Sequence, residues 1–242
     1  MRLVEARPLI RSRKTAEDTS IVRLHFFLSP NKQPVPFAYQ HYLTGAFHKW
    51  LGANQLHDAL SLYSLSWLYE GRARNQMIEF PHGAHWFISL HDESLAETLV
   101  NHALSDPEVC CGMRVARIEQ QATPRFGTSY TFKVGSPVLA RSKEIEGKVT
   151  HYLHSDPEAD AVLTATLRHK LDRAGFAAPH NEATVNFDKT YRNPKTKLVR
   201  IKDIHNRASI CPVHIEGTPE ALAFAWNVGV GHGTGSGFGS LL

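Results

Sequence analysis

Cysteines and long apolar runs are scarce in this sequence. Only three cysteines occur in 242 residues: Cys110 and Cys111 are adjacent, and Cys211 is far from both. This spacing fits neither a disulfide framework nor a zinc-binding pattern, so a reducing cytoplasm is the simplest compartment. No run of about 18 apolar residues occurs, which argues against a membrane span. The N-terminal residues also lack the apolar core of a signal peptide. We therefore expect a cytoplasmic protein without membrane contact.

The length and the apolar content predict two folded domains. Apolar residues make up 42% of the chain, which is enough for a buried core and too many for a disordered protein. The 13 prolines and 16 glycines show no period, which excludes a collagen-like chain. A chain of 242 residues divides comfortably into two domains of about 120 residues each.

The positive charge is concentrated in one stretch. The whole chain carries a net charge of +4. Residues 189–207 hold seven basic side chains and a single acid, Asp203, and so carry +6, which leaves −2 for the rest of the chain. Such clustering is typical of a surface that binds a phosphate-rich partner, although a solvated hairpin would show the same pattern.

The first half of the sequence predicts a β-α-β-β-α-β order. Leu43, Phe47, Trp50 and Leu51 recur at the spacing of one helix face. The flanking segments alternate or are rich in β-forming residues. The predicted strands are 21–28, 63–69, 85–90 and 113–121, and the predicted helices are 37–51 and 93–104. This order is that of the ferredoxin-like unit.

The second half repeats this order more loosely. Leu163, Leu167 and Leu171 stack along a helix that Gly175 ends. We therefore predict an α+β fold of two tandem ferredoxin-like domains, 19–122 and 123–242, after an N-terminal extension at 1–18. The predicted elements of the second half are strands at 130–134, 149–153, 183–187 and 208–213, helices at 155–175 and 218–226, and a final short strand.

A glycine-rich segment lies near the C-terminus. Six of the 16 glycines occupy alternate positions from Gly229 to Gly239. Glycine permits close backbone approach, and successive N–H groups in such a loop can form an anion-binding nest. A dinucleotide fingerprint needs a helix after the glycines, and a P-loop needs Gly-Lys-Ser/Thr; neither is present. Phe238 and the final leucines argue against a flexible tail and for a packed strand.

These motifs resemble those of a known family. The pattern Gly229-Val230-Gly231, a spacer, and Gly237-Phe238-Gly239 is similar to the C-terminal glycine-rich loop of CRISPR-associated endoribonucleases of the RAMP superfamily, which cut the repeat transcript. The resemblance runs from about Ile21 to the C-terminus. It also includes Val35-Pro36-Phe37, Tyr63-Ser64-Leu65-Ser66 and Ser136-Pro137-Val138. The family's fold is two tandem ferredoxin-like domains.

The resemblance implies RNA cleavage without a metal ion. In the family a general base takes the proton of a 2′-hydroxyl, whose oxygen attacks the phosphate and leaves a 2′,3′-cyclic phosphate and mature crRNA. The family's base lies in or just after the first helix, and His48 and His57 match that region. The two histidines are expected to act as base and acid, with Lys49 as a charge stabiliser. The alternative is that either histidine is an ordinary helix-surface residue.

The same resemblance assigns the basic stretch and the glycine-rich loop to RNA binding. Contacts of Lys and Arg with phosphates give affinity without base specificity, and Tyr191 is suited to stacking on an unpaired base. The expected RNA-binding residues are Arg125, Lys189, Arg192, Lys195, Lys197, Arg200, Lys202, Arg207, Gly231, Gly233, Gly235, Gly237 and Phe238.

Neither a metal nor another cofactor is expected. His82 and His85 are three residues apart, but no carboxylate or thiol lies at ligand spacing beside them. The expected partner is CRISPR repeat RNA, with other subunits of an effector complex as further candidates. Two other functions stay open: a non-cleaving RNA-binding subunit of an effector complex on the same fold, and a ferredoxin-like small-molecule enzyme without RNA affinity.

Overall fold

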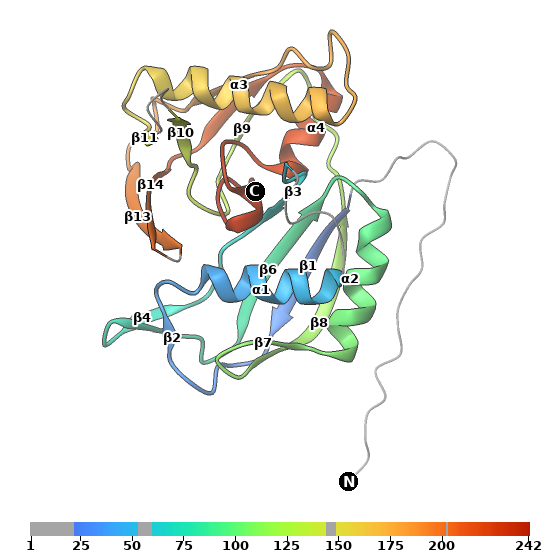
Figure 1. Ribbon diagram of the computed structural model, residues 1–242, viewed down its shortest axis with the longest axis vertical. Coiled ribbons are helices and arrows are strands. Elements are labelled where there is room, and N and C mark those ends of the chain that lie inside the picture. Colours follow the sequence, from blue (N-terminus) through green and yellow to red (C-terminus); the bar gives the residue numbers. More distant parts are fainter. Residues whose placement is uncertain (1–21, 53–59, 144–148, 202) are drawn as a thin grey trace.

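Two layered halves make up the protein, one above the other in Figure 1. The computed structural model describes residues 22–52, 60–143, 149–201 and 203–242. The N-terminal extension expected at 1–18 lies outside these residues. No described helix is both long and apolar enough to cross a membrane.

The N-terminal half is a ferredoxin-like domain. Its main sheet has the strand order β3-β6-β1-β8-β7. The first four strands of this order are the β-α-β-β-α-β arrangement that the sequence predicts. The elements are β1 (Val22–Leu28), α1 (Gln40–Leu51), β3 (Tyr63–Leu65), β6 (Ala84–Leu90), α2 (Ser94–Ser105), β7 (Glu108–Cys110) and β8 (Met113–Ala122).

The alternation of β1 explains how this sheet is covered. Leu24 and Phe26 are at most 1% exposed and point toward the helices, as the period of two requires. Phe26 stacks on Trp50 of α1 with 5.3 Å between ring centroids. The opposite face of the strand carries Arg23 and His25. The predicted strand 63–69 ends early, at Leu65.

A small second sheet lies at one end of this half (Figure 1). It has the order β2-β5-β4 and is antiparallel. Its strands are β2 (Val35–Pro36), β4 (Arg72–Arg74) and β5 (Met77–Glu79).

The C-terminal half repeats the fold with a reduced fourth strand. Its sheet has the order β12-β15-β9, and the position next to β9 is taken by a single bridge between Val134 and Leu241. The fold of two tandem ferredoxin-like domains is therefore confirmed, while the expected final strand is only one bridge long. The elements are β9 (Ser129–Phe132), α3 (Glu158–Arg173), β12 (Thr184–Phe187), β15 (Val213–Glu216), α4 (Pro219–Val228) and the short 3-10 helix η2 (Thr234–Ser236).

Two hairpins are inserted into this second domain. β10 (Ala140–Lys143) pairs with β11 (Val149–Tyr152), and β13 (Lys195–Ile201) pairs with β14 (Ile204–Ile210). The predicted strand 149–153 therefore exists but lies outside the domain sheet, paired with a strand that the sequence did not indicate. The predicted strand 208–213 is wrong as one element, because Cys211 and Pro212 separate β14 from β15. A proline has no N–H for a ladder hydrogen bond, which favours this break.

Candidate nucleic-acid interface

Three parts of the molecule converge on the glycine-rich segment, defined here as residues 229–239. Figure 1 shows it in dark red between the two halves, above α1. The indole Nε1 of Trp67 donates a hydrogen bond of 2.8 Å to the carbonyl oxygen of Gly237. Phe238 is 1% exposed and clusters with Val199 and Ala208 of the basic hairpin. A Cβ on Gly237 would also lie 3.7 Å from Cγ of Gln40 in α1. The segment thus contacts α1, the loop after β3 and the basic hairpin β13–β14.

Close contacts with neighbouring atoms require glycine at two positions of this segment. Gly231 has a φ of +72°, and a Cβ there would lie 2.6 Å from the carbonyl oxygen of Leu139. A Cβ on Gly235 would lie 2.6 Å from Oγ of Ser61 and 2.7 Å from the hydroxyl of Tyr63. A larger residue at either position would displace neighbouring backbone or side chains. These glycines therefore let the segment seat against both domains.

The side chains of the segment are mostly buried. Phe238 packs in the cluster described above, and Gly231, Gly235 and Gly237 are buried, while Gly233 is half-buried. In this conformation the Phe238 ring is covered by protein. A contact between this segment and RNA would therefore come from its partly exposed positions.

His48 lies in the last part of α1, as the sequence predicts. It is half-buried, and its ring packs edge-on against Phe47 with 5.2 Å between centroids. Phe47 in turn contacts Tyr63, at 4.6 Å between ring centroids, and Tyr63 lies against Gly235. A short chain of packed side chains thus links the helix turn of His48 to the glycine-rich segment.

Lys49, another expected catalytic residue, makes its contacts with the turn before β7. Lys49 donates from Nζ to Oδ2 of Asp106 at 2.9 Å and to the carbonyl oxygen of Glu108 at 2.8 Å. This contact holds the pKa of the Asp106 carboxyl below its usual range. Lys49 therefore connects α1 to the turn between α2 and β7. His57 lies outside the described residues.

The basic hairpin distributes its charges over both faces. Lys195 and Lys197 are on the face of Val199, which packs toward Phe238, because alternate residues of a strand share a face. Arg200 and Arg207 are on the opposite face, where Leu198 pairs with Arg207. Arg200 forms an ion pair with Asp203 at 3.2 Å. The four basic side chains are exposed.

The remaining expected contacts lie around this hairpin and in the linker. Lys189 pairs with Oδ2 of Asp160 at 3.2 Å and donates to the carbonyl oxygen of His154 at 2.7 Å, so it also fixes the start of α3. Arg192 and Arg125 are exposed. Tyr191 is 44% exposed, enough to offer a ring face. Lys202 lies outside the described residues.

Lys170 is a buried basic residue that the sequence patterns did not bring out. It is 2% exposed, and its ammonium donates to the carbonyl oxygen of Val228 at 3.1 Å and to Oγ1 of Thr234 at 3.0 Å. Burial lowers the pKa of this amine to about 7. Lys170 lies seven residues after Leu163, on the buried stripe of α3. A lysine on an apolar helix stripe is the sequence signal that could have revealed it.

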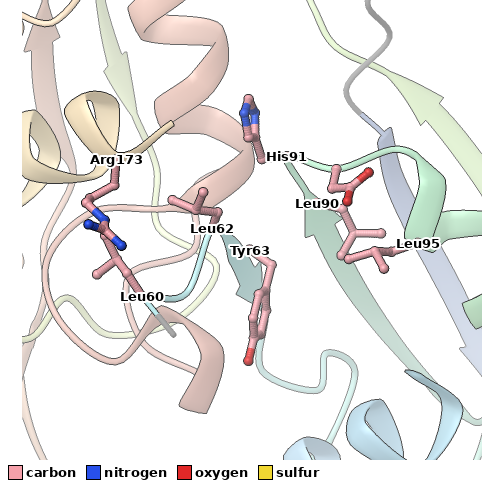
Figure 2. A pocket seen from close by; sticks show the side chains of 8 residues that line it. Leu60, Leu62, Tyr63, Leu90, His91, Leu95 and Arg173 are labelled. Atoms are coloured by element: carbon pink, nitrogen blue, oxygen red, sulfur yellow. The ribbon is translucent and has the colours of Figure 1, made fainter. Parts of the chain in front are cut away.

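A separate pocket lies between the two halves, on the side of α2 and the end of α3. Figure 2 shows Leu62 between Arg173 and His91, with Leu60 beside the Arg173 side chain and Tyr63 below. Its volume is about 230 Å³ and its lining is mainly apolar. None of the expected site residues that the structure describes lines it, although Tyr63 belongs both to the pocket and to the packing around Gly235. The complete lining is Leu60, Leu62, Tyr63, Leu90, His91, Asp92, Leu95 and Arg173.

No metal centre is evident in the described part of the chain. Across these residues no group of three or more His, Cys, Asp or Glu side chains is arranged to hold an ion.

A family model matches the second half of the chain. Residues 119–241 match the model described as CRISPR associated protein Cas6, C-terminal. Among curated proteins the sequence finds no significant match.

Solved structures with the same architecture cover nearly the whole chain. A Cas6-related protein from Pyrococcus furiosus superposes with a TM-score of 0.80 at 19% identity, over 92% of this chain and 98% of its own. A RAMP protein described as binding different RNA substrates gives 0.77 at 20% identity, over 91% and 98%. A Thermus thermophilus Cas6 in a product complex gives 0.67 at 16% identity, over 93% and 100%. At such identities the likeness shows a shared fold.

Proposed function

The chain belongs to the Cas6 family of CRISPR-associated proteins, and from that premise we propose that it is a metal-independent endoribonuclease that cuts the CRISPR repeat transcript. The observation that carries the proposal is the convergence of α1, the glycine-rich segment and the basic hairpin. The turn of α1 that carries His48, the backbone of the glycine-rich segment and the exposed cations of the basic hairpin therefore lie around one region. Solved relatives are described as binding RNA substrates or as a product complex, which supports RNA as the ligand here.

The proposed reaction is an in-line transfer at one phosphate. A base takes the proton of the 2′-hydroxyl, the O2′–P bond forms and the P–O5′ bond breaks. An acid gives a proton to the leaving O5′. The products are a 2′,3′-cyclic phosphate and a 5′-hydroxyl. Imidazoles suit both proton transfers, because their pKa values lie near neutral pH.

We assign these roles to His48 and His57. His48 is half-buried at the end of α1, where the packing of Phe47 on Tyr63 holds its turn against the glycine-rich segment. The charge that develops on the phosphorane needs cations or backbone N–H groups nearby. The glycine-rich segment and the basic hairpin supply them in this proposal. Lys49 would contribute only after leaving Asp106.

A cleavage assay in a chelator tests the function. The protein is incubated with 5′-labelled repeat RNA from the source genome in excess EDTA. The proposal predicts a product that ends in a cyclic phosphate. Activity that requires Mg²⁺ would overturn the mechanism. Tight binding without any cut would leave the protein as a non-cleaving RNA-binding subunit, and no binding at all would overturn both RNA functions.

A further inference from the structure

Positive groups surround one residue of the glycine-rich segment. His232 is half-buried, and its backbone N–H donates to the carbonyl oxygen of Leu139 at 2.8 Å. Leu139 directly precedes β10, so this bond fixes His232 beside the strand that carries Arg141. Lys170 of α3 also bonds to this segment, because its ammonium donates to the carbonyl oxygen of Gly229 and to Oγ1 of Thr234.

These basic groups have no acidic partner among the described residues. No carboxylate of the described residues forms an ion pair with His232, Arg141 or Lys170. The acceptors of Lys170 are two carbonyl oxygens and one hydroxyl, so its charge is hydrogen-bonded but not neutralised. A buried charge without a counter-ion is costly, and the cost falls when an anion binds nearby.

The surroundings of Arg141 add to the positive field. Arg141 pairs across the hairpin with His151 of β11. Burial, and then the charges of Arg141 and Arg207, lower the pKa of the His151 imidazole. Arg141 of β10, His151 of β11, Arg207 of β14 and Lys170 of α3 are all basic, and none of them forms an ion pair with a carboxylate of the described residues.

We propose that His232, Arg141 and Lys170 form a phosphate-binding site at the glycine-rich segment, and that this site takes up a proton when an RNA phosphate binds. The His232 imidazolium and the Arg141 guanidinium are strong donors to phosphate oxygens. Lys170 is buried and contributes positive charge without touching the phosphate. The site rests on the proposed function for the identity of its ligand. It is separate from the base and acid assigned above.

The proton uptake follows from the electrostatics of the free protein. Burial, and then the charges of Arg141 and Lys170, lower the pKa of His232 below its usual value, against the opposing hydrogen bond of the Leu139 backbone. Near neutral pH the ring is therefore mostly neutral. A bound phosphate offsets the cationic field and favours the charged ring, so its pKa rises on binding. Affinity then increases as the pH falls, by about tenfold for each unit by which binding raises the pKa.

Calorimetry with a matched variant tests the site. Repeat RNA made with 2′-O-methyl sugars, which lacks the attacking hydroxyl, is titrated at pH 7 into the protein in two buffers of different ionisation enthalpy. We expect the wild type to take up more protons than His232→Gln. Between pH 6 and pH 8 its affinity should fall about tenfold more than that of the variant. His82→Gln, an exposed histidine in the N-terminal domain, should behave as the wild type. Equal proton uptake by the wild type and His232→Gln would overturn the site.

A second probe separates this site from the proposed function. The His232 imidazole is followed by NMR during a pH titration with and without inorganic phosphate. A rise in its pKa with phosphate, weakened in Arg141→Gln, supports the site even if repeat RNA does not bind, in which case the RNA function alone falls. An unchanged His232 pKa with both phosphate and the modified RNA would overturn the site and leave cleavage untouched.

Discussion

The guanidinium carbon of Arg23 in β1 lies 3.4 Å from the ring centroid of Trp226 in α4. This side chain therefore connects the N-terminal sheet to the last helix of the C-terminal domain. The same guanidinium donates from Nη2 to the carbonyl oxygen of Trp226 at 2.8 Å and from Nε to Oγ of Ser89 at 2.7 Å. Arg23 is 2% exposed, and burial lowers its pKa to about 9. This residue therefore fixes the two domains that border the candidate interface.

Removing the Arg23 side chain should destabilise the protein. Arg23→Ala deletes two hydrogen bonds and a stacked cation and leaves the Trp226 carbonyl without its partner. We expect a loss of about 2–4 kcal/mol in the free energy of unfolding, measured by urea denaturation. Arg117→Ala is the matched control. Arg117 also stacks on an aromatic ring, Phe27, but its side chain is 58% exposed, and its loss should cost under about 1 kcal/mol. Equal losses of unfolding free energy in the two variants would contradict the role of Arg23 in connecting the two domains.

The basic hairpin should set the salt dependence of RNA binding. Removing one cation that touches a phosphate lowers the slope of log K against log salt by about 0.7–0.9. Lys197→Gln and Arg207→Gln, one on each face of the hairpin, are each expected to weaken binding and to reduce the slope by this amount. Arg114→Gln replaces an exposed arginine of β8 in the other domain and should leave the slope unchanged. An undiminished slope in both hairpin variants would remove the hairpin from the RNA site.

Lys170 should make stability depend on pH in a defined direction. The pKa of the amine is about 7 in the folded protein, against an ordinary value of 10.5. Between these values the unfolded chain holds one proton more than the folded chain. The free energy of unfolding therefore rises with pH in this window, by up to about 1.4 kcal/mol per pH unit. The gain is complete above pH 10.5 and is lost as the pH falls to 7.

Comparison with Lys170→Met isolates this contribution. The difference in unfolding free energy between the wild type and Lys170→Met, measured in urea at pH 7, 8 and 9, should shift in favour of the wild type as the pH rises. Replacement of a buried charge by an apolar side chain of similar length is often tolerated, so the variant should fold. Parallel pH profiles would show that the amine is not titrating in this range.

Helical periodicity predicted the first helix well. Leu43, Phe47, Trp50 and Leu51 are all at most 6% exposed in the structure, because their spacing places them on one face above β1. The alternation of β1 was equally informative. The four ferredoxin-like strands of the N-terminal sheet could therefore be predicted from hydrophobic patterns, whereas β15, the central strand of the C-terminal sheet, was not predicted.

The inserted hairpins could not be predicted in the same way. β10 lies outside the domain sheet, and its sequence Ala140-Arg141-Ser142-Lys143 shows no apolar alternation. The pairing of β10 with β11 depends on the register between the two strands, which no local pattern encodes. The strand prediction at 208–213 failed because Pro212 separates two strands that continue in β-forming residues.

Parts of the candidate site were visible in the sequence for different reasons. His48 and the glycines came from the resemblance to a family, and the basic hairpin came from charge clustering. Arg141, Lys170 and His232 were missed, because three separate elements bring them to one segment. Long-range convergence of this kind becomes visible only in the folded chain.

The rate of cleavage by His48→Ala, compared with its RNA affinity, tests the central claim most directly. Single-turnover cleavage of repeat RNA in EDTA and the Kd for the 2′-O-methyl repeat are measured for the wild type, His48→Ala and the exposed control His82→Ala. We predict that His48→Ala slows cleavage by about 10²-fold or more while its Kd stays close to that of the wild type. His82→Ala should match the wild type in both measurements. Cleavage by His48→Ala at the wild-type rate would contradict the assignment of a general base or acid to His48 of α1.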